Sequence, residues 1–194
     1  MDAMDGLDVT ACEECPELCA SRSRIVNGVG PADADLLFVG EAPGEREDRE
    51  GEPFVGRSGD VLDGALRENG LARADVRITN CVRCRPPDNR DPTDEELANC
   101  RGYLETEIEA VDPEFLVTLG KVPAEHLLDR SVTITDEAGD VVRAELGGAK
   151  RDVLLSVHPA ATLYDPGQRE AFERAIERAA AAVGSGDQAT FGDF

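Results

Sequence analysis

Four short segments with the pattern of buried strands, separated by helical patterns, constrain the fold of this chain more than any other feature. The first of them, Leu36–Val39, is a continuous apolar run, which is typical of a strand buried on both faces of a parallel sheet. The other segments are Val76–Thr79, Phe115–Leu119 and Val153–Val157, and the helical patterns span about 58–69, 94–111, 121–129 and 168–183. This alternation predicts an α/β fold of three layers, α/β/α, with a four-stranded parallel sheet between the helices.

Two further expectations concern the limits of this fold. A small hairpin, Val132–Thr135 with Val141–Glu145, is expected before the fourth strand because a glycine-containing turn separates two short β-branched runs. At 194 residues the chain fits one domain. We expect that domain to span residues 9–183, with flexible ends at 1–8 and 184–194.

Polar residues stand where the predicted strands end. The first strand leads into a glycine- and proline-containing loop, Gly40–Gly56, the second ends at Asn80, and the fourth is followed by His158. Open α/β sheets bind ligands at the carboxyl ends of their strands. The loop also carries several acids and one aromatic residue, Phe54, but no Gly-Lys-Ser/Thr motif. This combination favours a polar, planar ligand over a bare phosphate.

The net charge of −21, from 41 acidic and 20 basic residues, constrains the cellular environment and the binding partners of the protein. Only Lys121 and Lys150 are lysines. Such an acidic, lysine-poor surface favours a halophilic cytosol, where molar salt screens self-repulsion. The alternatives are an acidic surface in an ordinary cell and a nucleic-acid mimic. An acidic amino terminus and the lack of an 18-residue apolar run predict a cytoplasmic protein without a membrane span.

Six cysteines occur, at positions 12, 15, 19, 81, 84 and 100. Disulfides are not expected in a cytosolic chain. The two Cys-x-x-Cys pairs, at 12/15 and 81/84, are compatible with zinc, and four thiolates also suit a [4Fe–4S] cluster. The spacing predicts a four-cysteine metal centre between the amino terminus and the region after the second strand, without selecting the metal.

Several motifs occur together in order along the chain. They are Cys12-x2-Cys15, Gly40-Glu-Ala-Pro-Gly-Glu with Pro53-Phe-Val-Gly56, Thr79-Asn80 with Cys84-Arg-Pro-Pro87 and Asn89-Arg90, Cys100, and His158-Pro-Ala-Ala161. With them the chain resembles, over about residues 10–180, the family 4 uracil-DNA glycosylases, the iron–sulfur type. The resemblance implies the three-layer fold, hydrolysis of uracil from DNA to leave an abasic site, and a [4Fe–4S] cluster on Cys12, Cys15, Cys84 and Cys100.

The residues at the strand ends suit uracil, which must leave the base stack before it can be recognised. The amide of Asn80 offers a donor and an acceptor for O4 and N3–H, and Phe54 is expected to stack on the ring. His158 is expected to donate to O2 as negative charge develops on the leaving base. The segment of Glu41, Ala42 and Pro43 is expected to contact the base, with Glu41 orienting water because Ala42 occupies the position of the water-activating aspartate in other glycosylases.

Contacts with DNA require local positive charge and a residue that opens the base stack. The candidate phosphate contacts are Arg57, Arg85 and Arg90, together with Arg83 beside the cysteines and Arg46 and Arg49 in the first loop. The alternative is that each of these arginines balances neighbouring acids. Leu163, in the segment after His158, is the candidate wedge. The carboxyl-terminal Gln188, Phe191 and Phe194 resemble a peptide that docks on sliding clamps.

The predicted protein is therefore a monomeric, monofunctional uracil-DNA glycosylase of base-excision repair. One alternative is a relative that traps uracil-DNA covalently through a histidine after the second strand. No histidine occurs between Cys81 and Cys100, which argues against trapping. The other alternative is an iron–sulfur electron carrier, which would not need Asn80 and His158 at one edge of the sheet.

Overall fold

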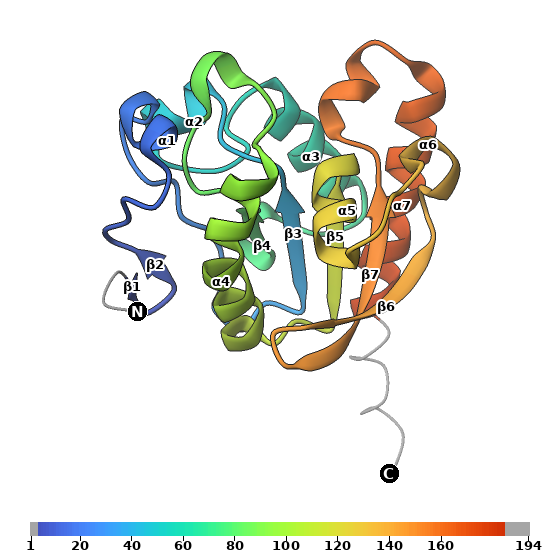
Figure 1. The fold of residues 1–194 in the computed structure, drawn as a ribbon. Helices are drawn as coiled ribbons and strands as arrows, with labels where there is room; N and C mark the ends of the chain where they lie inside the picture. Colours follow the sequence, from blue (N-terminus) through green and yellow to red (C-terminus); the bar gives the residue numbers. More distant parts are fainter. Residues whose placement is uncertain (1–3, 185–194) are drawn as a thin grey trace.

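The computed structural model describes residues 4–184, which fold around one central sheet (Figure 1). The sheet has five strands in the order β4-β3-β5-β7-β6. The parallel strands are β3 (Leu36–Gly40), β4 (Arg77–Asn80), β5 (Phe115–Leu119) and β7 (Ala149–Ser156). They correspond to the four predicted strands, so the predicted parallel sheet is confirmed.

The edge of the sheet differs from the prediction. The fifth strand, β6 (Val141–Leu146), pairs antiparallel with β7. The predicted hairpin is wrong, because its first half contains the short helix α6 (Ile134–Glu137) instead of a strand. The hairpin turn is Gly147-Gly148, where φ is 55° and 72°. Two positive φ values match the tight turns that join twisted antiparallel strands, and glycine adopts them without steric cost.

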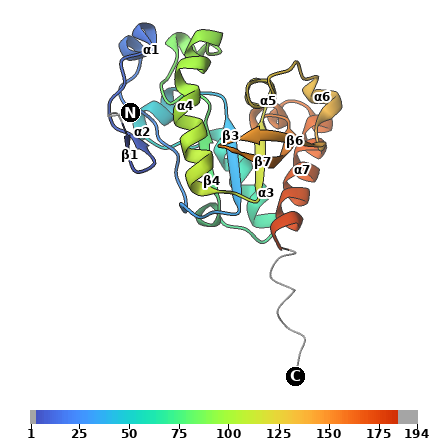
Figure 2. The same cartoon turned by 60° about the horizontal axis from the view of Figure 1, so that its bottom comes forward.

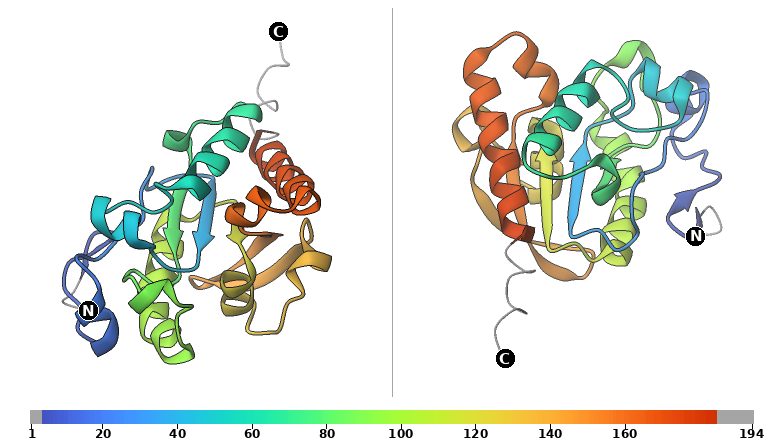
Figure 3. Two further views of the ribbon diagram at one scale, coloured as in Figure 1. Left: turned by 90° about the horizontal axis from the view of Figure 1, so that it is seen from above. Right: turned by 180° about the vertical axis from the view of Figure 1, so that it is seen from behind.

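Helices cover both faces of the sheet. On one face, α3 (Arg57–Glu68) and α7 (Pro166–Gly184), which Figure 3 shows from behind, enclose a core that includes Phe38. On the other, α4 (Asp94–Val111) and α5 (Lys121–Leu128) enclose a core that includes Leu37. Neighbouring residues of β3 therefore point into different cores, as the pleat requires. The predicted three layers are confirmed.

The remaining elements are short. They are β1 (Met4–Asp5), β2 (Asp8–Val9), α1 (Pro16–Ser21), α2 (Glu45–Glu50) and the 3-10 turns η1 (Arg73–Asp75), η2 (Pro87–Asn89) and η3 (Pro159–Leu163). Figure 2 shows α1 beside one end of α4. Across the described residues, no helix combines the length and apolar character needed to cross a membrane.

A buried ion-pair group ties the sheet to α4. Glu107 of α4 is fully buried and accepts hydrogen bonds from Arg77 at 2.8 Å and Arg83 at 2.5 Å. A buried carboxylate with two guanidinium partners is compensated, whereas one left without them would be costly. The group fixes α4 against the segment that follows β4.

Candidate active site

The carboxyl ends of β3 and β4 lie side by side and bring two candidate residues together. Gly40 at the end of β3 is in register with Asn80 at the end of β4. The pairing continues past both strands, since Cys81 N donates to Gly40 O at 2.9 Å and Val82 N donates to Glu41 O at 3.0 Å. The main chain of Glu41 is therefore fixed directly beside the strand that carries Asn80.

Phe54 and His158 complete the site from other parts of the chain. Their ring centroids lie 5.7 Å apart with planes tilted by 30°. A Cβ atom on Gly40 would lie 2.3 Å from Asn80 Oδ1 and 2.5 Å from Phe54 Cε2, which is closer than van der Waals contact allows. Two predicted site residues, Asn80 and Phe54, thus pack against one glycine at the edge of the sheet, where only a residue without Cβ fits.

Two residues that the sequence analysis did not select hold Phe54 in place. Its φ of 55° lies in the left-handed region, which is uncommon for an aromatic residue. The carboxylate of Glu47 accepts hydrogen bonds from the N–H of Phe54 and, at 2.5 Å, from the N–H of Gly44. The guanidinium of Arg73 donates to the carbonyl oxygens of Phe54, at 3.2 Å, and of Pro53. The main chain of Phe54 is therefore held from both sides.

The side chain of Asn80 is 2% exposed. Its amide Nδ2 has no hydrogen-bond partner among the described residues. A buried polar donor that lacks a partner carries a desolvation cost, so such atoms call for an explanation. A ligand with an acceptor at this position would satisfy the amide.

The protonation of His158 follows from its surroundings. Burial lowers its pKa from 6.5 to about 4, so the ring is uncharged at neutral pH. Its Nδ1 accepts a hydrogen bond from the N–H of Ala160 at 3.1 Å. A neutral ring that accepts at Nδ1 carries its proton on Nε2. His158 is therefore a neutral hydrogen-bond donor through Nε2–H.

Glu41 is the acidic residue among the candidate site residues. Burial, reinforced by the charge of Asp91 and a hydrogen bond to it, raises the pKa of Glu41 to about 7. Both protonation states of Glu41 are then populated near neutral pH. Asp91, an exposed residue of the loop before α4, was not selected from the sequence because its spacing from Glu41 carries no signal. Ala42 is half-buried and Pro43 is buried beside Glu41.

The cysteines divide into two groups. One pocket is lined by Cys12, Cys15, Cys84 and Cys100, the four that the resemblance implies as ligands, and also by Cys19. Cys81 is fully buried in the core between the sheet and α4. Within residues 4–184, no three His, Cys, Asp or Glu side chains are arranged to hold a single metal ion.

Hydrogen-bond donors also face this cysteine pocket. Arg22 donates to Cys84 Sγ at 2.9 Å and to the carbonyl oxygen of Cys12 at 2.7 Å, and Asn99 donates to Cys15 Sγ at 3.5 Å. Burial raises the pKa of the Cys84 thiol. Thiolates in such a pocket need a positive partner, which a metal centre and Arg22 can supply. The hydrogen-bond donors around these cysteines are therefore compatible with a metal centre that is ligated by thiolates.

The arginines proposed for DNA contact lie in different settings. Arg57 is exposed at the first residue of α3, and Arg85 donates to Asn89 Oδ1 at 2.8 Å. Arg90 forms ion pairs with Glu96 at 2.7 Å and with Glu17 at 3.0 Å. Arg83 is 1% exposed, so the interpretation of this residue as a phosphate contact is wrong. Its guanidinium belongs to the buried group around Glu107.

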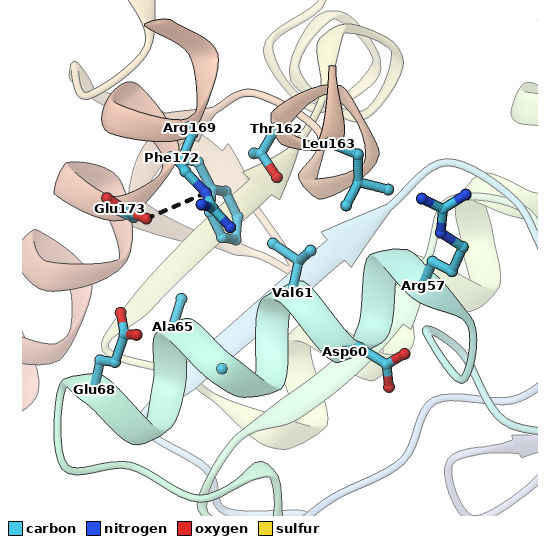
Figure 4. Close-up of a pocket in the computed structure, with 11 residues that line it drawn as sticks. Arg57, Asp60, Val61, Ala65, Glu68, Thr162, Leu163, Arg169, Phe172 and Glu173 are labelled. Carbon is cyan, nitrogen blue, oxygen red and sulfur yellow. Dashed lines mark ion pairs between the residues drawn. The ribbon is translucent and has the colours of Figure 1, made fainter. Parts of the chain in front are cut away.

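A pocket between α3, η3 and α7 lies beside the candidate wedge (Figure 4). Leu163 is half-buried and lines this pocket together with Arg57 and Val61. Figure 4 shows the side chains of Thr162 and Leu163 above α3. Gln188, Phe191 and Phe194, the candidate clamp-binding residues, lie outside the described residues.

Comparisons with known proteins relate the chain to uracil-DNA glycosylases. A family model described as the uracil DNA glycosylase superfamily matches residues 27–180. The chain is 42% identical over 179 residues to the Type-4 uracil-DNA glycosylase of Archaeoglobus fulgidus, covering 89% of each chain. It is 44% identical over 153 residues to that of Thermotoga maritima, covering 78% of each. A Type-5 uracil-DNA glycosylase of Pyrobaculum aerophilum is 31% identical over 207 residues.

Proposed function

The chain belongs to the uracil DNA glycosylase superfamily, and on that basis we propose that it hydrolyses the N-glycosidic bond of uracil in DNA. The products are free uracil and an abasic site, so the reaction begins base-excision repair. The observation that carries this proposal is the buried, unpartnered Nδ2 of Asn80 beside Phe54 and His158. That donor needs an acceptor, and O4 of a flipped uracil provides one.

In the proposed complex the flipped base lies against Phe54. Nδ2 of Asn80 donates to O4 while its Oδ1 accepts from N3–H, which together recognise uracil and not cytosine. The held backbone of Phe54 keeps the ring in one position, so the aromatic face is preorganised for stacking. Thymine carries an additional methyl group and is excluded by shape at this surface.

Bond cleavage then places negative charge on the base and positive charge on the sugar. The C1′–N1 bond breaks, its electron pair stays with uracil, and water adds to C1′. His158 donates through Nε2–H to O2 as the negative charge grows, which stabilises the leaving group. The carboxylate form of Glu41 orients the water and accepts its proton. With a pKa of about 7, enough Glu41 is ionised at neutral pH for this role.

We further propose that Cys12, Cys15, Cys84 and Cys100 hold a [4Fe–4S] cluster. In such a cluster each thiolate binds a different iron, so the four sulfurs need not converge on one point. The pocket that these cysteines line agrees with that requirement. When bound, the cluster would crosslink the segment before α1 to α4 and to the loop after β4. The purified protein should be brown and contain roughly four irons per chain; a colourless protein with one zinc would refute the cluster.

The binding partners, oligomeric state and cellular location of the protein are proposed from its sequence. The protein acts as a monomer on uracil-containing DNA in the cytoplasm of a halophile, near the nucleoid. The carboxyl-terminal segment with Gln188, Phe191 and Phe194 docks on the sliding clamp through apolar anchors, so the contact should persist in molar KCl. Removing residues 188–194 should abolish co-elution with the clamp and leave excision from short oligonucleotides unchanged.

The glycosylase proposal is tested with a uracil-containing oligonucleotide at high KCl. Alkali treatment after incubation should cleave the strand at the uracil position, and a matched thymine-containing strand should stay intact. Untreated samples should show no stable protein–DNA adduct in a denaturing gel. An adduct without free uracil would instead indicate a trapping protein, and intact DNA with no adduct would refute both activities.

A further inference from the structure

Tyr164 is the one exposed large hydrophobic residue in the part of the chain that the structure describes, and its side chain is 80% exposed. It directly follows η3, the turn that begins after His158. Exposure of an isolated apolar side chain is ordinary on a protein surface. Tyr164, however, lies beside the edge of the sheet that carries His158, so its exposed ring is placed to contact DNA bound at that edge.

The backbone between His158 and Tyr164 is held rigidly. Ala161 N donates to His158 O at 2.9 Å, Tyr164 N donates to Ala161 O at 3.2 Å, and Thr162 Oγ1 donates to Pro159 O at 2.7 Å. The turn also packs against α3 and α7. Because a 3-10 turn rises about 2 Å per residue, Tyr164 lies on the order of 10 Å from His158 along the turn. A rigid turn therefore presents the ring of Tyr164 at a fixed distance from His158.

Leu163 is less available than Tyr164 for insertion into DNA. It is half-buried against the pocket between α3 and α7, where it lines the wall with Val61 (Figure 4). Moving it into DNA would expose that pocket. Tyr164 projects from the same turn without any such packing to lose.

We propose that Tyr164 enters the duplex and stacks in the space that the flipped uracil leaves. This inference rests on the glycosylase function proposed above. Glycosylases must break stacking to extrude a base, and side chains inserted between base steps compensate for part of that loss. An aromatic ring stacks on any neighbouring base, so the contact is independent of sequence. Leu163 then supports the ring from the pocket instead of entering the duplex.

The test compares Tyr164→Ala, Tyr164→Phe and Leu163→Ala on the same uracil-containing strand, either single or annealed to its complement. Single-turnover excision is followed at high KCl, and 2-aminopurine placed next to uracil reports unstacking through its fluorescence. Tyr164→Ala should lose about 10-fold in rate on duplex, the order expected for one aromatic stack, and change little on single strands. Tyr164→Phe should retain the rate and the fluorescence change.

Other outcomes would overturn the inference. Equal loss on single and double strands would indicate a general defect, and a duplex-specific loss only in Leu163→Ala would place Leu163 in the stack. Unchanged duplex rates in Tyr164→Ala would also refute it. If the unmodified protein releases no uracil from either substrate, the glycosylase proposal itself fails. That result is distinct from a working enzyme that does not depend on Tyr164.

Discussion

Replacing His158 with alanine tests whether a neutral imidazole stabilises the leaving base. Removing one preorganised donor to a developing oxyanion costs about 10²–10³-fold in rate. Because the pKa of His158 is about 4, its hydrogen bond is made by an uncharged donor, and we expect the lower end of that range. The predicted loss is ~100-fold, or ~2.7 kcal/mol of transition-state stabilisation. Single-turnover uracil release from a short oligonucleotide, at high KCl and pH 5.5–8.5, measures it.

The pH profile separates a neutral donor from a charged one. Glu41, with a pKa of about 7, should give a rate that rises between about pH 6 and 8 as its carboxylate forms. His158 stays uncharged over this range, so His158→Ala should lower the whole curve without shifting that rise. If His158 instead acted as a charged imidazolium, the activity of the unmodified protein would fall above about pH 6.5, where histidine loses its charge. That fall would be absent in His158→Ala.

His126 provides a matched control for His158. Burial also lowers the pKa of His126 to about 4, but this residue lies in α5 and is assigned no contact with the base. His126→Ala should retain the excision rate, and circular dichroism should show that both variants are folded. A near-normal rate in His158→Ala, or a falling limb near pH 6.5 that only this variant removes, would contradict the proposed chemistry.

Four further predictions concern recognition, packing and the metal centre. Asn80→Asp should reduce uracil excision and begin to release cytosine, because a carboxylate accepts from the N4 amino group and repels O4; unchanged excision without cytosine release in base-release assays would contradict this. Gly40→Ala should weaken uracil binding at least 10-fold, since the new methyl group overlaps Asn80 and the Phe54 ring; inhibition by free uracil measures it, and an unchanged constant would refute the packing. Glu107→Ala should lower the free energy of unfolding by about 3–5 kcal/mol in denaturant titrations, because two buried guanidinium groups lose their partner, and a loss below about 1 kcal/mol would contradict the buried group. Cys84→Ala should lose bound iron while Cys81→Ala retains it, and the reverse pattern in iron analysis would exchange their roles.

The parallel sheet and its edge were predictable because they depend on local patterns. Strands buried on both faces appear as uninterrupted apolar runs, and the residue after such a run lies at the carboxyl edge of the sheet. The positions of Asn80 and His158 at this edge could therefore be predicted from the sequence. The strand β6 was predicted almost completely, as Val141–Glu145, but its partner was not, since the pairing with β7 depends on the turn at Gly147 and Gly148.

Charged residues that act inside the fold were harder to predict. Glu47 and Arg73 stand in charged stretches that are typical of exposed surface, and the positive φ that they support at Phe54 has no sequence signature. Arg83 was assigned to DNA because it stands next to cysteines and other arginines. Its partner Glu107 is 24 residues away in α4, and only tertiary structure brings the two together.

Successive side chains of the loop after β4 point into different parts of the interior, which restricts the length of the loop. Cys81 lies in the core beneath α4, Val82 and Cys84 pack with Cys100, and Arg83 reaches Glu107. Inserting or deleting a single residue would move the guanidinium toward the cysteine pocket and a thiol toward the buried carboxylate. It would also displace every residue relative to Asn80, which precedes the loop directly. The loop after β4 should therefore admit substitutions but no change in its number of residues.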